Sequence, residues 1–392
     1  MTPSARLQAA IDLLDEIIVA ARDNGASADN IAKKYFKTRR YAGSKDRRAI
    51  REYVYSCIRR FGERPESGRS AMVGLATEMP ELNVLFDDTP YGPKGLLPNE
   101  TASSGGLIPS WLEPHFSELI DDAEKQALFD RAPLDIRRNT SLASDKILQE
   151  EWPEAEQLPF AEAYRLPSGT NIEQSALHRN GAVEIQDCGS QAIVKACLVQ
   201  NARIVLDMCA GAGGKTLALA DQLPKAVRIV AADTDLRRLG RLKPRAERAG
   251  ASNIETLLLN PNQEIDALSS FAGLCDVVLV DAPCSGTGTW RRNPELRWRM
   301  TSRRLEQTVD LQARLLTLAS KMVVPGGRLV YAVCSLLDIE GGNQIESFLK
   351  DHPDWNHIEI DLPLGRQYRK GTMLTPYYDG TDGFYFTALE KK

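Results

Sequence analysis

The 392-residue sequence has no apolar run long enough to span a bilayer. Its first residues, up to Asp23, carry acidic side chains at helical spacing and lack the uncharged apolar core of a signal peptide. Both absences argue against a membrane-bound or secreted protein. We therefore expect a cytoplasmic protein with no membrane association.

Cysteine and histidine are few and scattered. The seven cysteines are odd in number and irregular in spacing, which argues against a disulfide framework in a reducing compartment. No two cysteines have the spacing of zinc ligands, and the four histidines are near none of them. We expect no metal site. We also expect a monomer, because no pattern indicates a symmetric interface.

The net charge of −4 gives no overall attraction to nucleic acid, but the charges are unevenly distributed. Ile31–Ser70 contains 13 Lys or Arg and 4 Asp or Glu, a local excess of nine positive charges. A solvated helical face explains such a run when it is taken alone. An anionic partner becomes the better explanation if other features point to RNA.

The chain contains four segments that differ in composition and in hydrophobic periodicity. Residues 1–90 show helical periodicity, and 91–106 are rich in Pro, Gly, Ser and Thr, as in a linker. Residues 107–182 mix short patterns and predict a small α+β domain. From 183 to 392, strands alternate with helices, which predicts an α/β fold with a mostly parallel sheet and helices on both faces. The expected strands are 203–208, 227–233, 275–283 and 326–335, and the expected helices are 215–223 and 236–250.

A glycine-rich loop follows the first of these strands. Leu206–Thr216 reads LDMCAGAGGKT, and Asp233 lies 20 residues after Gly213, at the end of the next strand. Glycines let a ligand approach the backbone N–H groups at a helix start, and an acidic residue at this distance accepts the hydroxyls of an adenosine ribose. The spacing of Asp233 favours a cofactor over a purely structural turn.

Two phosphate-binding motifs fit this loop less well. The Walker A pattern needs glycine where Cys209 stands, and Asp207 would repel a triphosphate. The dinucleotide pattern GxGxxG lacks its third glycine. S-adenosylmethionine (SAM) carries sulfonium and ammonium cations, which carboxylates attract, so it suits an acidic loop better. A P-loop NTPase remains an alternative, and magnesium-stimulated phosphate hydrolysis would support it.

Two cysteines directly follow two of the expected strands. Cys284 lies in DAPCSG and Cys334 in LVYAVCS. Ligands bind at the carboxyl ends of parallel strands, so both thiols can face one pocket together with Asp281. A lone cysteine is usually a small core residue, but two at equivalent strand ends weaken that interpretation.

A thiolate, a carboxyl group and a methyl donor suit the methylation of cytosine at carbon 5. A thiolate that adds to carbon 6 pushes electron density onto carbon 5, which then accepts the methyl group. A protonated carboxyl group on ring nitrogen 3 stabilises the developing charge. Carbon 5 must then lose its proton and the thiol must leave, so two thiols can have different roles.

The chain resembles the RNA 5-methylcytosine methyltransferases of the RsmB/Sun family over nearly its whole length. The motifs that carry the resemblance are CAGAGGKT, DAPCSGTGTWRRNPELRW, LQARLLTLASKMVVPGGRLVYAVCS, DGFYFTAL and QDCGSQ at 186–191. In the first segment, GSKDRRAIREYVYSCIRR is similar to the family's NusB-type RNA-binding domain. The resemblance implies a Rossmann-like SAM-dependent methyltransferase domain at 183–392.

The resemblance also implies roles for the matching residues. Cys334 is the expected nucleophile and Cys284 is expected to serve product release. Asp281 is expected to lie near both base and cofactor, and Lys215 to help orient the base. The SAM site is expected to contain Cys209, Ala210, Gly211, Ala212, Gly213, Gly214, Lys215, Asp233, Asn260 and Asp281.

Three departures from the family pattern affect this site. Gly211-Ala212 stand where the family usually has Ala-Pro, which predicts a looser turn. Asn260 replaces an aspartate near the adenine, which predicts modestly weaker cofactor binding. Ala332-Val333 replace Ser-Thr before the second cysteine and remove a hydroxyl group beside the nucleophile.

An arginine-rich stretch follows the DAPCSG turn. With Trp290 and Trp298 as aromatic faces for an unstacked base, it is expected to form a phosphate-binding groove beside the pocket. A solvated helix face with core tryptophans is the alternative. The target cytosine must leave its stack to reach the thiol, which predicts a looped or single-stranded site. The arginines are Arg291, Arg292, Arg297, Arg299, Arg303 and Arg304.

Small-subunit ribosomal RNA is the expected substrate, given the helical N-terminal segment, and transfer RNA is the second choice. A non-catalytic RNA-binding assembly factor that retains the fold is a further alternative. It predicts RNA binding with a steep salt dependence but no binding of SAM.

Overall fold

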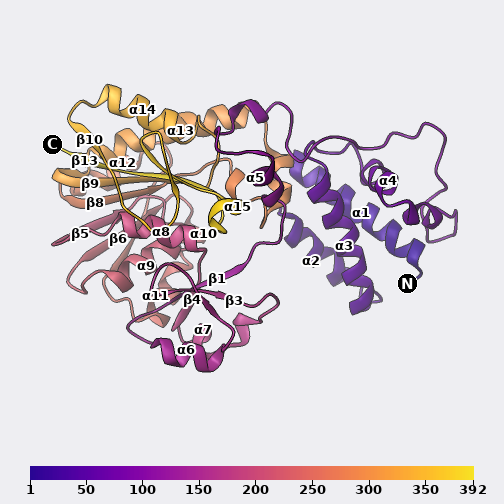
Figure 1. Cartoon of the computed structure of the whole chain (residues 1–392), viewed down its shortest axis with the longest axis horizontal. Helices are drawn as coiled ribbons and strands as arrows, with labels where there is room; N and C mark the ends of the chain where they lie inside the picture. The colour runs from indigo at the N-terminus through magenta and orange to yellow at the C-terminus, as the bar shows by residue number, and fades with distance from the viewer. The chain divides into compact units, whose positions relative to one another are not determined.

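The helical periodicity near the N-terminus corresponds to four helices that pack on one another (Figure 1). The first begins at Pro3, where the Thr2 side chain accepts a hydrogen bond from the Ala5 N–H and so caps the helix. Leu7 and Leu14 lie on its buried face. The helices are α1 (Pro3–Arg22), α2 (Ala28–Thr38), α3 (Ser44–Arg60) and α4 (Gly68–Glu78).

The computed structural model describes residues 1–392, which divide into two units. One contains Met1–Asp130 and Trp290–Thr301, and the other contains Arg131–Thr289 and Ser302–Lys392. The segment 107–130, which includes α5 (Asp122–Ala127), therefore groups with the helices. The four sequence segments, with boundaries at 90, 106 and 182, stay a prediction of domain organisation.

The expected linker at 91–106 has no helix or strand but lies against the helices of the first unit. The Ser103 N–H donates to the Ser70 carbonyl at 2.9 Å, and the Gly106 carbonyl accepts from the Gly62 N–H at 2.8 Å. These backbone hydrogen bonds hold the last four residues of the segment in place.

The two tryptophans expected to face RNA belong to the core of the first unit. Trp290 is 0% exposed and Trp298 is 1% exposed. The Trp298 Nε1–H donates to the Phe61 carbonyl at 2.7 Å, and Trp290 stacks on Phe129. The expectation of exposed aromatic faces is therefore wrong, because burial of an indole gains a large apolar contact area while its N–H can reach a backbone carbonyl.

The arginines of the same stretch do not all face solvent. Arg297 is buried and donates from Nε to the Phe61 carbonyl at 3.2 Å, and Arg291 is buried as well. Arg299 donates from Nη1 to the Gly25 carbonyl at 2.9 Å. Several of these arginines thus hold the first unit together, which contradicts a continuous phosphate-binding groove.

The second unit begins with a small antiparallel sheet in the strand order β2-β3-β1-β4. Ile136, Tyr164 and Val183 form its apolar core together with Leu148. The elements are β1 (Leu134–Arg138), α6 (Asp145–Glu151), β2 (Glu156–Gln157), β3 (Ala163–Leu166), α7 (Ala176–Arg179) and β4 (Val183–Ile185).

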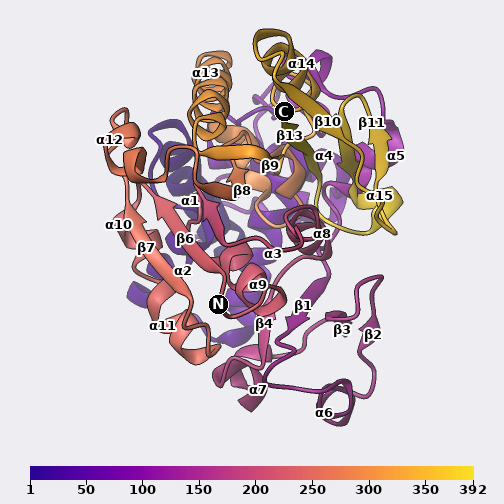
Figure 2. The same cartoon turned by 90° about the vertical axis from the view of Figure 1, so that its left-hand side faces the viewer.

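The rest of this unit is built on a nine-stranded sheet. Strands β7, β6, β5, β8 and β9 run parallel in that order, and β13 continues the sheet antiparallel to β9. Figure 2 shows the sheet from β7 on one side to β11 on the other. The strands are β5 (Ile204–Asp207), β6 (Arg228–Asp233), β7 (Ile254–Leu258), β8 (Cys275–Asp281), β9 (Val323–Val333), β10 (Trp355–Ile358), β11 (Arg366–Tyr368), β12 (Gly371–Leu374) and β13 (Phe384–Lys391).

Helices cover both faces of this sheet, with α13 and α14 along one side and α8 and α9 along the other (Figure 1). The α/β fold with a mostly parallel sheet is therefore confirmed. The expected helix at 236–250 is interrupted after Leu239, because Pro244 has no N–H to donate to the Gly240 carbonyl. The helices are α8 (Cys188–Ala196), α9 (Gly214–Gln222), α10 (Leu236–Leu239), α11 (Leu242–Arg248), α12 (Glu264–Leu268), α13 (Ser302–Ser320), α14 (Gly342–Asp351) and α15 (Pro376–Asp379). None of the helices combines the length and the apolar character needed to cross a membrane.

Candidate active site

The loop between β5 and α9 turns at two glycines with left-handed backbone conformations. Gly211 has φ +56° and Gly213 has φ +82°. A Cβ on Gly211 would lie 2.5 Å from Arg238 Nη2, and one on Gly213 would lie 2.1 Å from Leu242 Cδ1. The left-handed dihedral angles favour glycine at both positions, and the buried Leu242 side chain adds a steric reason at Gly213.

Asp233 fixes this loop from the end of β6. Its Oδ2 accepts a hydrogen bond from the Gly211 N–H at 2.7 Å, and its Oδ1 accepts from the Asp235 N–H at 2.7 Å. The Ala210 N–H donates to the Ala232 carbonyl at 2.9 Å. The carboxylate expected to bind a ribose is thus held in one orientation by backbone donors on two sides.

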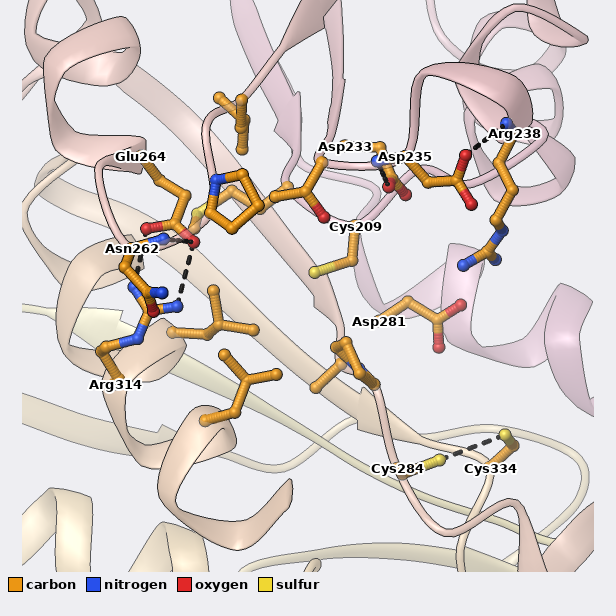
Figure 3. A pocket seen from close by; sticks show the side chains of 18 residues that line it. Cys209, Asp233, Asp235, Arg238, Asn262, Glu264, Asp281, Cys284, Arg314 and Cys334 are labelled. Atoms are coloured by element: carbon orange, nitrogen blue, oxygen red, sulfur yellow. Dashed lines mark hydrogen bonds and ion pairs between the residues drawn. The ribbon is translucent and has the colours of Figure 1, made fainter. Parts of the chain in front are cut away.

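A cavity of about 430 Å³ opens at the carboxyl ends of β5, β6, β8 and β9 (Figure 3). It brings together five of the residues predicted from the sequence, namely Cys209, Asp233, Asp281, Cys284 and Cys334. These residues come from four different strand ends, as expected for ligand sites of open α/β sheets. The predicted thiols therefore share one cavity with the cofactor loop.

The two cysteines of this cavity are in direct contact. Cys284 Sγ lies 3.2 Å from Cys334 Sγ, and Figure 3 shows the two sulfurs pointing toward each other. The neighbouring strands set this approach, because Asp281 of β8 is paired with Ala332 of β9. The hydrogen bond with Cys334, together with burial, raises the pKa of the Cys284 thiol well above its usual value. Cys284 therefore keeps its proton at neutral pH.

Asp281 forms an ion pair with Lys215. The Lys215 Nζ donates to Asp281 Oδ2 at 2.6 Å, with the lysine side chain 11% exposed and the aspartate 31% exposed. Burial opposes the charge of Lys215, but the attraction of Asp281 outweighs it, so the pKa of Lys215 is raised. A permanent cation behind Asp281 thus orients a carboxyl group that remains open to the cavity.

Burial also raises the pKa values of two groups at this loop, Asp207 and Cys209. It raises the pKa of Asp207 to about 7, although Thr216 Oγ1 donates to Asp207 Oδ2 at 2.7 Å. It raises the pKa of the Cys209 thiol well above its usual value, and the charge of Asp207 adds to this effect. Cys209 is therefore a neutral thiol on the cavity wall and not a nucleophile.

The other residues expected at the cofactor site do not line the cavity. Ala210, Gly211, Ala212, Gly213 and Gly214 form the loop behind Cys209. The side chain of Asn260 is exposed and lies outside the lining. The lining instead contains Asn262, whose φ of +65° follows the bend at Pro261. In the sequence, Asn260-Pro261-Asn262 predicts a turn. That turn was the available signal that Asn262, and not Asn260, could lie at the cavity.

Sequence reasoning missed two cations at the cavity. Arg314 of α13 forms a double hydrogen bond with Glu264, at 2.7 and 2.9 Å. Arg238 of α10 follows Asp233 by five residues, and its guanidinium approaches Gly211. Figure 3 shows the two arginines on opposite sides of the cavity.

The residues present fit SAM. The lining contains the carboxylates of Asp233, Asp235 and Asp281, which attract a sulfonium or an ammonium group. Lys215, which stands at the lysine position of a triphosphate loop, is instead paired with Asp281. The cavity therefore suits a cationic adenosine compound.

Replacing Gly213 with alanine is expected to weaken binding of S-adenosylhomocysteine about tenfold. A left-handed conformation costs alanine about 1–2 kcal/mol, and the new methyl group displaces Leu242. Isothermal titration calorimetry measures the affinity. Gly250→Ala is the matched control, because Gly250 has φ +65° with no atom near its Cβ and lies outside the loop. Equal affinities for the two variants would contradict the role of the loop.

Comparisons with known proteins identify the family of the chain. Residues 195–390 match the family model of the 16S rRNA methyltransferase RsmB/F. The "Ribosomal RNA small subunit methyltransferase B" of Pectobacterium carotovorum subsp. carotovorum is 31% identical over 301 residues, which is 74% of this chain and 67% of that protein. Other relatives of that name align over 65% and 52% of their own length, so this chain spans about half to two thirds of them.

Solved structures share the fold. The crystal structure of PH0851 superposes with a TM-score of 0.77 over 100% of both chains, at 21% identity. The methyltransferase homolog protein from Pyrococcus horikoshii superposes with a TM-score of 0.60 at 25% identity, over 69% of this chain and 90% of that one.

The doubly wound sheet, the glycine loop and the acidic cavity define a SAM-dependent methyltransferase. Within that class, the chain belongs to the RsmB/F family of RNA methyltransferases.

Proposed function

We propose that this chain methylates carbon 5 of a cytosine in RNA through a covalent enzyme–RNA adduct. The contact of 3.2 Å between the sulfurs of Cys284 and Cys334, inside the cavity of the cofactor loop, carries the proposal. Nitrogen and oxygen atoms of RNA have lone pairs and can take a methyl group without enzyme thiols. A pair of thiols is useful where the acceptor is a carbon that must first be activated.

Cys334 acts as the nucleophile in this proposal. Its thiolate sulfur forms a bond to carbon 6, and the electron pair of the carbon 5–carbon 6 double bond moves to carbon 5. SAM supplies an electrophilic methyl group, which carbon 5 accepts. A proton shared between Asp281, which is held by Lys215, and ring nitrogen 3 stabilises the negative charge that develops on the pyrimidine ring.

Cys284 acts in the second half of the reaction. The proton on carbon 5 passes to a base, the double bond forms again, and the electron pair of the bond to carbon 6 returns to the sulfur of Cys334. The Cys284 thiol keeps its proton and lies in contact with that sulfur, so it can donate a hydrogen bond to the leaving thiolate.

The helices of the first unit are proposed to bind RNA. The basic excess of Ile31–Ser70 lies mainly on α2 and α3, where Lys33, Lys34, Lys37 and Lys45 are exposed. Exposed lysines can neutralise phosphates in any sequence context. This surface therefore supports binding to RNA but does not select the cytosine.

Small-subunit ribosomal RNA is the proposed substrate, as the names of the relatives suggest. Unmodified small-subunit ribosomal RNA is expected to accept label from radioactive SAM, and bisulfite sequencing is expected to locate it as 5-methylcytosine. Transfer RNA transcripts are the comparison substrate. Label on transfer RNA alone would overturn the ribosomal assignment, and RNA binding without transfer would favour a non-catalytic assembly factor.

A further inference from the structure

Glu340 is a buried carboxylate behind the two cysteines. It lies between β9 and α14, six residues after Cys334, and is 0% exposed. Its Oε1 accepts hydrogen bonds from the Ser285 N–H at 2.8 Å and from Gln312 Nε2 at 3.1 Å. Its Oε2 accepts from Ser335 Oγ at 2.5 Å and from Ser285 Oγ. One carboxylate thus receives four hydrogen bonds.

The hydrogen-bonded serines directly follow the two cysteines. Ser285 is the neighbour of Cys284, and Ser335 is the neighbour of Cys334. Glu340 therefore connects the loop after β8 to the loop after β9 at the residues next to the sulfurs. A shift of the carboxylate would move both thiols relative to each other.

Tyr331 and Gln312 hold Glu340, and Gln344 in turn lies against Gln312. The Tyr331 hydroxyl of β9 donates to its backbone carbonyl at 2.7 Å. Gln312 of α13 donates from Nε2 both to the carboxylate and to the Pro283 carbonyl, the latter at 2.9 Å. Gln344 Nε2 of α14 donates to the Val309 carbonyl at 2.8 Å and lies 3.5 Å from Gln312 Oε1. A fully connected buried network of this kind fixes one arrangement, since losing one member leaves buried donors unpaired.

We propose that Glu340 is a positioning residue that keeps the sulfurs of Cys284 and Cys334 in contact. It is absent from the lining of the cavity, so it acts through the two serines and not on the RNA. Its importance for catalysis rests on the proposed function. The placement of the sulfurs can be tested without RNA or SAM.

The test measures how fast the two thiols form a disulfide with diamide. Two thiols lose two electrons and two protons, and the azo bond of diamide takes them up to give a hydrazine. Peptide mapping by mass spectrometry identifies the Cys284–Cys334 bond. Glu340→Ala is expected to slow this step about 100-fold, since a misplacement of about 1 Å has an effect of that size on reactions between positioned groups.

Glu340→Gln is expected to remain within a few-fold of the wild-type rate, because its amide oxygen accepts from the Ser285 N–H and the serine hydroxyls can accept from its amide nitrogen.

Glu162→Ala is the matched control. Glu162 is a buried carboxylate of the same unit that pairs with Lys195 and not with the serines next to Cys284 and Cys334. Both alanine variants lose a buried charge, and only Glu340→Ala is expected to lose the fast disulfide. Equal rates in the two variants would overturn the proposal. If thermal unfolding shows that Glu340→Ala does not fold, Ser335→Ala replaces it, with an expected slowing of about tenfold, and a wild-type rate would overturn the proposal.

Methyl transfer gives a second readout. Glu340→Ala is expected to lower kcat and to leave the KM for SAM unchanged, because the residue lies outside the cofactor wall. A raised KM with unchanged kcat would overturn the positioning role. If the wild-type protein forms the disulfide fast but methylates no RNA, the proposed function fails while the placement of the sulfurs by Glu340 stands.

Discussion

Cys334→Ala is expected to lower methyl transfer to RNA by at least about 10⁴-fold while leaving SAM binding unchanged. Carbon 5 of cytosine has little nucleophilic character until a thiolate has added to carbon 6. The hydrogen bond with Cys334, which contributes most to the raised pKa of Cys284, is lost in this variant, but burial still raises the pKa values of Cys284 and Cys209, so neither thiol replaces the missing thiolate. Single-turnover transfer of radioactive methyl groups measures the rate, and calorimetry measures the binding of S-adenosylhomocysteine.

Cys275→Ala is the matched control for this substitution. Cys275 begins β8, the strand whose other end carries Asp281, and its side chain is fully buried. It is expected to cost some stability and to keep the methyl-transfer rate. Full activity of Cys334→Ala would show that the nucleophile has been assigned to the wrong cysteine.

The meeting of the two cysteines was predictable because it follows from local patterns. Each thiol comes within three residues of a strand end, and parallel strands place such ends at one edge of a sheet. The register that pairs Asp281 with Ala332 then brings Cys284 and Cys334 together. The glycine loop was predictable for a similar reason, because a tight approach of backbone and ligand needs glycine wherever it occurs.

Trp298 and Glu340 could not be placed from the sequence. An indole beside arginines suits either an RNA surface or a core, and the contact that decides is with the carbonyl of Phe61, 237 residues earlier in the chain. Glu340 is a charged residue in a loop between a strand and a helix, where a solvent-exposed side chain is the ordinary expectation. Its burial depends on donors from α13 and from the loop after β8, which only the tertiary fold assembles.

Cys284→Ala is expected to trap a covalent RNA adduct on Cys334 and to lower turnover by about 100-fold or more. The first half of the reaction needs only the sulfur of Cys334, so the adduct forms and the methyl group is transferred. The second half loses the hydrogen bond that supports the leaving sulfur. A denaturing gel with radioactive RNA is expected to show a protein–RNA band that is absent in the double variant Cys284→Ala/Cys334→Ala.

Cys284→Ser separates the hydrogen bond from the rest of the thiol chemistry. A serine hydroxyl can donate to the leaving sulfur and does not ionise at neutral pH, so the serine variant is expected to release the adduct faster than the alanine variant. The rate of disappearance of the gel band after a chase with unlabelled RNA measures release. Equal rates for serine and alanine would contradict release by hydrogen bonding, and absence of any adduct in both variants would remove Cys284 from the release step.

Because the raised pKa of Cys284 keeps its proton in place, wild-type release is expected to stay constant between about pH 6 and 8, where an ordinary thiol begins to ionise only at the upper limit.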